Sequence, residues 1–124
     1  MRSRFSLVLG GALLTLSLQA WAHHGWSGQE TTQSTISGTV KTALSLAGPH
    51  ATMQIVDDKG QVWDLTLAPP ARTARAGLSE DTIPVGAKVT VVGNRNRDQS
   101  RFEMKTVRVT FDGKNYDVYP DRVS

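Results

Sequence analysis

Three histidines are the residues of this sequence best suited to chemistry, and two of them are adjacent. His23 and His24 follow a segment with the features of a secretory signal, and His50 lies in the tripeptide Gly48-Pro49-His50. The chain contains no cysteine, so it offers neither a thiolate ligand nor a thiol nucleophile. Imidazole nitrogen is therefore the strongest donor available to a transition metal.

The segment before these histidines has the three parts of a signal peptide over residues 1–22. A positive start precedes the apolar run Phe5–Leu18, and a small-x-small cleavage site ends at Ala22. The apolar run is shorter than the roughly 20 residues that cross a bilayer. We therefore expect cleavage after Ala22 and export to the periplasm, which makes His23 the first residue of a mature domain over 23–124.

An N-terminal histidine is a chelating residue, because its α-amine and its ring Nδ1 belong to one residue. Both groups titrate close to neutral pH, so a metal ion displaces their protons at little cost. A third nitrogen completes a set that suits Cu(II), the strongest-binding divalent ion of its series. His50 can supply that nitrogen; alternatively, the amide and ring of His24 supply it, and no fold is needed. The predicted metal ligands are therefore His23, His24 and His50, and the predicted cofactor is copper.

Other polar residues have simpler interpretations. Asp57-Asp58 and Asp112-Gly113 occupy predicted turns, where aspartate bonds the local backbone. No nucleophile motif, phosphate loop or positioned pair of carboxylates occurs, so we expect a protein that is not an enzyme. Trp26 shields a metal site, binds a ligand, or anchors the polar lead-in to the domain. An anion-binding patch would require the helical segment and a later loop to be neighbours, and its members would be Arg72, Arg75, Arg95, Arg97 and Arg101.

Charge and length restrict the partners. The formal net charge of +3 includes Arg2 and Arg4, and their loss with the signal leaves the mature domain near +1. A basic surface for nucleic acid is not expected at that charge, nor is membrane contact after cleavage. Removal of 22 of the 124 residues leaves enough chain for one domain. The alternatives to a copper module are an adaptor for an envelope protein or glycan, and an oxidative copper enzyme, for which so small a domain leaves little room.

The mature chain is typical of a small β-domain with one short helix. Pro69-Pro70 begins a helix of roughly two turns that Gly77 ends. The apolar residues of the fifth strand change phase, which predicts a β-bulge near Lys105-Thr106. The predicted strands are Ser34–Ala43, Ala51–Val56, Gln61–Leu67, Lys88–Gly93, Arg101–Phe111 and Tyr116–Tyr119.

This order places the helix between the third and fourth strands, as in a five-stranded OB-like barrel. Alternating apolar residues give each strand one buried face, which a small barrel requires. The predicted fold class is therefore all-β with one short helix, a small OB-like β-barrel over residues 23–124. A small β-sandwich is the alternative.

Short motifs in a fixed order resemble a known family. They are the histidine pair at the signal junction, Ser37-Gly38-Thr39-Val40, Pro49-His50-Ala51, and a glycine- and valine-rich run from Gly77 to Gly93. Together they resemble the DUF6152 family of small exported bacterial proteins of unknown function. The family's Asn-Pro-His segment is Gly-Pro-His here, so the asparagine beside the histidine is lost. The resemblance implies the compartment and the fold type, and it matches both histidine positions.

Overall fold

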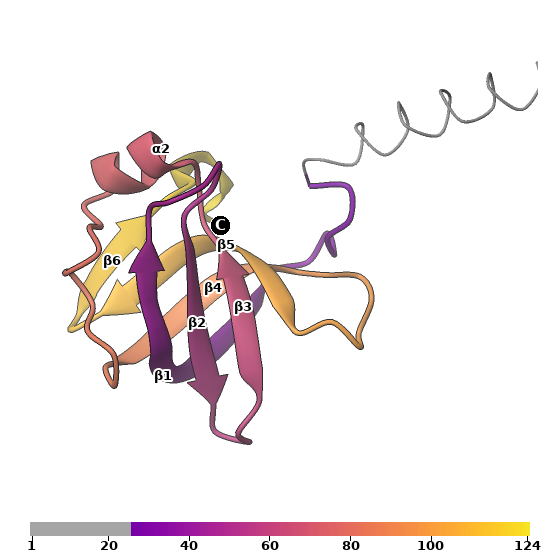
Figure 1. Cartoon of the computed structure of the whole chain (residues 1–124). Coiled ribbons are helices and arrows are strands. Elements are labelled where there is room, and N and C mark those ends of the chain that lie inside the picture. Colours follow the sequence, from indigo (N-terminus) through magenta and orange to yellow (C-terminus); the bar gives the residue numbers. More distant parts are fainter. Residues whose placement is uncertain (1–25) are drawn as a thin grey trace, which may run out of the picture.

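The computed structural model describes residues 26–124, which form six strands, the short helix α2 and the 3-10 turn η2 (Figure 1). The predicted order of three strands, a helix, two strands and a terminal hairpin arm is confirmed. In chain order, the elements are β1 Ser34–Ser45, β2 Thr52–Asp57, β3 Val62–Thr66, α2 Pro70–Arg75, β4 Lys88–Arg95, β5 Glu103–Phe111, β6 Lys114–Asp117 and η2 Pro120–Arg122.

The sheet closes into a barrel. The strand order is β3-β2-β1-β4-β5-β6, and β3 also pairs with β5. That additional pairing is parallel, with Leu65 opposite Met104, whereas the other strand pairs are antiparallel. Five strands therefore form a closed ring, and β6 extends from β5 as an arm. The closed ring confirms the small OB-like barrel and rules out the β-sandwich.

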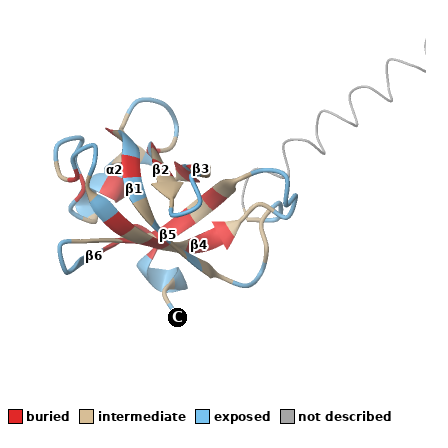
Figure 2. Ribbon diagram, turned by 90° about the horizontal axis from the view of Figure 1, so that it is seen from below, coloured by how far each residue is buried: buried red, intermediate tan, exposed pale blue. Residues whose placement is uncertain are grey.

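The barrel interior is filled by the apolar residues that alternate along the strands (Figure 2). Met53 and Ile55 of β2 are buried, as are Trp63 and Leu65 of β3. Each fully buried aliphatic side chain contributes roughly 1.5–3 kcal/mol of transfer free energy. The largest fully buried side chains are Met53, Ile55, Leu65, Leu67, Met104, Val40, Val91, Val107, Val109, Val118, Thr73 and Thr106.

The predicted bulge lies in β5. Val92 pairs with Arg108, but the next residue of β4, Gly93, pairs with Thr106, so Val107 is the extra residue. Thr106 and Val107 are both buried, which accounts for the phase change in the sequence. A side chain at Gly93 would not fit, because its Cβ would lie 2.3 Å from the carbonyl oxygen of Lys105.

The helix α2 is held by the barrel rather than by its own length. Its six residues begin with Pro70, and so short a helix is unstable alone. The buried hydroxyl of Thr73 donates to the carbonyl oxygen of Ala68, 2.9 Å away. Gly77 follows with a φ of 103°, a left-handed conformation that favours glycine and ends the helix as predicted. Helix α2 is thereby fixed to the end of β3.

Most strands begin or end one or two residues from the predicted positions, and β1 and the last strand are the clearest cases. β1 continues to Ser45, because its pairing with β2 extends to Thr52. The last strand is Lys114–Asp117 rather than Tyr116–Tyr119, because Lys114 pairs with Phe111 directly across the turn. Among residues 26–124, no helix has the length and apolar character needed to cross a membrane.

Candidate functional site

Trp26, the first described residue, is anchored to the barrel. Its ring lies 5.0 Å from the ring of Tyr119 in an edge-to-face arrangement. The Arg122 guanidinium stacks over the indole at 3.9 Å, and the Lys105 Nζ lies 4.8 Å from the indole centre. Of the roles considered for Trp26, anchoring is the one that these contacts demonstrate. We call Trp26, Arg72, Lys105, Tyr119 and Arg122 the cation–aromatic cluster.

The residues after Trp26 are bonded to the β4–β5 connection. Glu30 donates its backbone N–H to the carbonyl of Arg95 at 2.9 Å, and Arg97 Nε donates to the carbonyl of Gln29 at 2.8 Å. Gln29 also forms an isolated antiparallel bridge with Asn96. The lead-in to β1 is therefore an ordered part of the domain and not a loose tail.

His50 lies in the connection between β1 and β2 and is half-buried. The next residue, Ala51, is fully buried and donates its N–H to the carbonyl of Ala68, just before α2. Figure 1 shows this connection, α2 and η2 at the same end of the barrel. His50 therefore lies at the end of the barrel to which Trp26 is also anchored through η2.

The other two predicted ligands, His23 and His24, lie outside the described residues 26–124. The structure thus locates His50 alone of the predicted set. Within 26–124, no three His, Asp or Glu side chains group so that they could hold a metal ion. A metal site at this end of the barrel would need donors from the residues before Trp26.

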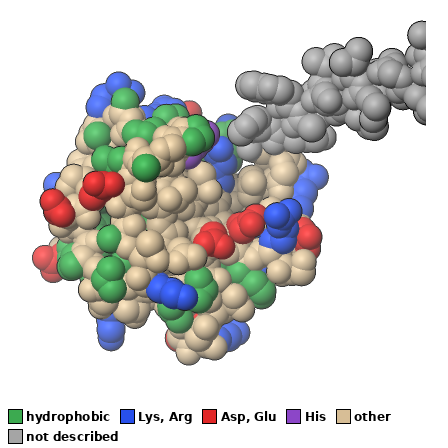
Figure 3. Space-filling model, viewed as in Figure 1, with side chains coloured by type: hydrophobic (Ala, Val, Ile, Leu, Met, Phe, Trp, Pro, Cys, Tyr) green, Lys and Arg blue, Asp and Glu red, His purple; other side chains and the backbone are tan. Residues whose placement is uncertain are grey.

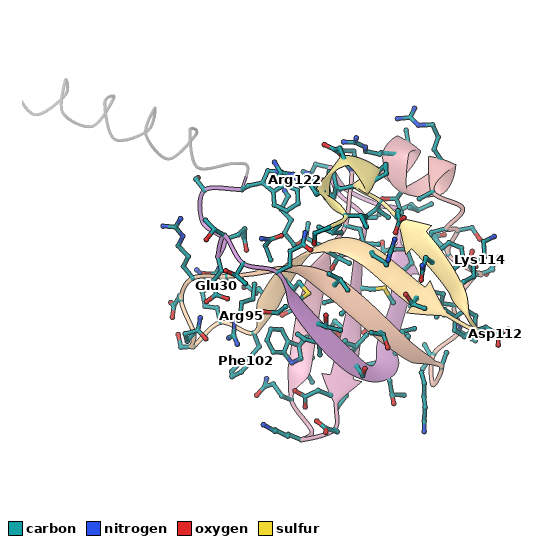
Figure 4. The ribbon with its side chains drawn as sticks, turned by 180° about the vertical axis from the view of Figure 1, so that it is seen from behind. Glu30, Arg95, Phe102, Asp112, Lys114 and Arg122 are labelled. Carbon is teal, nitrogen blue, oxygen red and sulfur yellow. The ribbon has the colours of Figure 1, made fainter. Side chains whose placement is uncertain are left out.

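The five arginines considered as one anion patch divide into two groups. One group lies on α2, and the other lies at the end of β4 and in the β4–β5 connection. The Arg95 guanidinium lies 4.8 Å from the centre of the Trp63 ring and 5.7 Å from that of the Phe102 ring, and the two rings contact each other edge-to-face. Figure 4 shows Glu30, Arg95 and Phe102 together on one side of the barrel. Arg72 lies on α2, which Figure 1 shows away from the β4–β5 connection. A single patch of all five is therefore not formed.

The outer face of β1, β2 and β3 is polar and has no basic stripe. Its side chains form a ladder, in which Thr42 donates to Gln54 and Gln54 donates to Asp64, each at 2.7 Å. Asp64 pairs in register with Glu103, so two acidic residues are neighbours. Figure 3 shows this face, with Lys and Arg only scattered over it.

A groove of about 590 Å³ lies between the β2–β3 and β5–β6 hairpin tips. Hydroxyl side chains cross it in register, because Ser37 pairs with Thr90 and Thr90 pairs with Thr110. The Ser37 and Thr90 hydroxyls are 3.2 Å apart. The exposed Lys88 and Asp112 also line the groove. Asp57 and Asp58 line it as well, so the groove combines hydroxyl groups with acidic side chains.

Asp57, at the edge of this groove, has a structural role. The Trp63 indole N–H donates to its Oδ2 at 3.0 Å, and the backbone N–H groups of Lys59 and Gln61 donate to its Oδ1 at 2.9 Å. These bonds, the one from Trp63 first, hold the pKa of Asp57 below its usual value. The carboxylate therefore holds the hairpin turn together, as predicted for a turn aspartate.

The sequence did not reveal the surroundings of Trp26. Lys105, Tyr119 and Arg122 come from β5 and the C-terminal turn, far from Trp26 in the chain. Burial raises the pKa of Tyr119, and burial followed by the charge of Arg122 lowers the pKa of Lys105. The one available signal was the C-terminal run Tyr119-Pro120-Asp121-Arg122, which combines an aromatic and a basic residue.

The fold and its surface define a small OB-like β-barrel domain. The chain belongs to the DUF6152 family, described as a family of unknown function, whose sequence model matches residues 12–105. This confirms the resemblance found in the motifs.

Solved structures agree with the fold. The crystal structure of the ZRD-deleted mutant of TiaS in complex with agmatine is similar at a TM-score of 0.53 and 13% identity, over 69% of this chain and 26% of that one. The chain therefore spans about a quarter of the length of that protein. The mitochondrial single-stranded DNA binding protein Rim1 from S. cerevisiae is similar at a TM-score of 0.50 and 13% identity, over 67% of this chain and 96% of that one. No curated protein matches the sequence. At such identities the likeness concerns the fold alone.

Proposed function

We propose that this protein is an exported binding module that holds one Cu(II) ion at the end of its barrel and does not turn over a substrate. The amine and Nδ1 of His23 form the chelate, and His50 provides the third nitrogen. The observation that supports this most is the anchoring of Trp26 by Tyr119 and Arg122, at the end of the barrel where His50 lies. Only two residues separate His23 from Trp26.

This arrangement distinguishes a folded site from simple peptide chelation. An anchored Trp26 restricts the reach of the preceding residues to about 3.5 Å per residue. His50 is half-buried on the folded barrel, so it loses less entropy on binding than a ligand in a free peptide. Arg122 and Lys105 repel a dication near Trp26, so the titration is made near physiological ionic strength, where such repulsion is screened.

The test is a Cu(II) titration of the mature protein with a native His23 terminus, followed by electron paramagnetic resonance. We expect a one-to-one site with three nitrogen ligands. His50→Ala should weaken it about tenfold or more, whereas the exposed neighbour control Thr52→Ala should not. An alanine added before His23 should abolish the site, because it blocks the chelating amine.

Two results would contradict this proposal. If His50→Ala and the folded His50→Gln variant both leave the spectrum and affinity unchanged, the copper is held by His23 and His24 as a peptide. If copper binds weakly or not at all to the native protein, metal binding is not the function.

The hydroxyl-lined groove favours a second candidate, a module that binds an envelope glycan. Thr90 lies at its centre, bonded to Ser37 and in register with Thr110. A soluble N-acetylglucosamine oligomer should shift the backbone amide signals of these residues in an NMR titration. Thr90→Val should reduce the affinity, and Thr42→Val on the other face should not. Absence of shifts at these residues would reject this candidate.

A further inference from the structure

A second cavity lies between α2 and the C-terminal end of the chain. Its volume is about 260 Å³, and two arginines of α2 line it. Arg72 and Arg75 are three residues apart, so they are neighbours on one side of the helix. The complete lining is Arg72, Arg75, Ala76, Asp117, Val118 and Pro120.

The charges of this cavity are not balanced. Asp117 is bonded to the guanidinium of Arg108, whose NH2 nitrogen lies 3.0 Å from its Oδ2, so its charge is already paired. Arg72 has Asp121 at 3.5 Å, but both side chains are well exposed, and such pairs contribute little. The Arg75 side chain forms no hydrogen bond or ion pair with any residue in 26–124. The cavity therefore has excess positive charge.

The cation–aromatic cluster adjoins this cavity through Arg72. The Arg72 guanidinium lies 5.0 Å from the centre of the Tyr119 ring, and the Lys105 Nζ lies 5.9 Å from the same centre. Arg122 lies over Trp26. A cation that stacks on an aromatic ring keeps its full charge, whereas the charge of a cation paired with a carboxylate is neutralised. Three cations from three different elements therefore gather here, and within residues 26–124 Asp121 is the one acidic residue paired with them.

We propose that the cavity between α2 and the C-terminal turn binds the phosphate group of a ligand. Arg72 and Arg75 are the binding residues, and Lys105 and Arg122 increase the attraction from a longer distance. Two guanidinium groups present several N–H donors, and a phosphate has enough oxygens to accept from both. A carboxylate has two oxygens and is satisfied by one such group, so phosphate fits the pair of arginines better. The cavity lies at the same end of the barrel as the proposed copper site, but His50 is not among its lining residues.

The experiment is a calorimetric titration of the copper-free mature protein with pyrophosphate. A parallel measurement uses vesicles of phosphatidylglycerol, with phosphatidylcholine vesicles as the neutral comparison. The test variant is Arg72→Gln with Arg75→Gln, both on exposed or half-exposed positions of α2. The control variant Lys41→Gln with Lys59→Gln removes the same charge from exposed positions of β1 and of the β2–β3 turn. Thermal unfolding verifies that each variant is folded.

We expect pyrophosphate binding that the arginine variant weakens by about tenfold or more and the lysine control changes less than about twofold. Asp121→Asn should tighten binding, because it removes the competing carboxylate from Arg72. Binding to phosphatidylglycerol vesicles alone, lost in the arginine variant, would support the same site and assign it to a lipid headgroup. The proposal would be overturned if neither pyrophosphate nor phosphatidylglycerol vesicles bind. Equal losses of affinity in the arginine and lysine double variants would also overturn it.

Discussion

The guanidinium of Arg122 lies 3.9 Å from the centre of the Trp26 indole ring, so the last described turn of the chain holds the first described residue. Tyr119 contacts the same indole edge-to-face, and Gln33 donates to the backbone carbonyl of Arg122 at 2.7 Å. The segment before β1 is thus positioned by residues that follow β6. This contact fixes Trp26, the start of the described chain, on the barrel.

Replacing Trp26 should destabilise the fold. Trp26→Ala removes a half-buried aromatic side chain and its contacts with two cations, and we expect a loss of about 2 kcal/mol in the free energy of unfolding. Trp26→Phe should cost less than half of that. Urea unfolding followed by circular dichroism measures both. A Trp26→Ala variant as stable as the parent would mean that the lead-in is not anchored.

Gly93→Ala should be strongly destabilising. The new Cβ would lie 2.3 Å from the Lys105 carbonyl oxygen and 2.9 Å from the Cα of Thr106. Backbone atoms at the bulge must then move, at a cost of about 3 kcal/mol. The control is Gly28→Ala, whose Cβ would meet nothing within 4 Å. Equal urea midpoints for the two variants would show that the bulge adapts freely.

Thr106→Val should stabilise the protein. The hydroxyl of Thr106 is buried and has no hydrogen-bond partner in the described part of the chain. A buried hydroxyl without a partner costs about 1–3 kcal/mol, and valine fills the same volume without it. We expect a gain of about 1 kcal/mol in urea unfolding, with Thr106→Ser less stable than the parent. A loss with valine would reveal a bonded hydroxyl.

The ion pair between Arg108 and Asp117 should make the free energy of unfolding depend on pH. The hydrogen bond from Arg108 lowers the pKa of the Asp117 carboxyl, so the charged form is favoured in the folded state. Its contribution is complete above the pKa of an unfolded aspartate, about 3.9, and is lost as the pH falls through the lower folded value. Asp117→Asn should therefore be less stable than the parent at neutral pH, and the difference should shrink below about pH 4.

Urea midpoints from pH 2 to pH 7 would measure this effect. The exposed variant Asp58→Asn changes the same charge and should show no such convergence with the parent. A constant difference between Asp117→Asn and the parent across this range would contradict the assigned role of the ion pair.

Local pattern was sufficient to predict most of the fold. Alternation located the strands within a few residues, and the proline pair with Gly77 located α2. The phase change in β5 located the bulge at Val107, one residue beyond the predicted pair. These features depend on residues close in sequence, where backbone preference and burial act directly.

Contacts between residues that are distant in sequence could not be predicted from local sequence pattern. The parallel pairing of Leu65 with Met104 closes the barrel, but strand alternation is the same for any partner. The cluster around Trp26 combines four separate segments, and each of its residues alone resembles an ordinary surface cation or core aromatic. For the predicted metal ligands, His50 is located by the structure, whereas the chelating role of His23 and His24 stays a prediction.

The contact between Arg122 and Trp26 also determines how the protein can be handled experimentally. Because the two ends of the described chain are joined there, a C-terminal affinity tag would lie beside the residues that precede the barrel and would disturb measurements made on them. A circularly permuted variant offers a remedy: a short linker joins the old ends, and new termini open at the exposed Asp58–Gly60 turn. Such a variant has no free α-amine at His23, so it should lose the proposed copper site while the barrel stays intact.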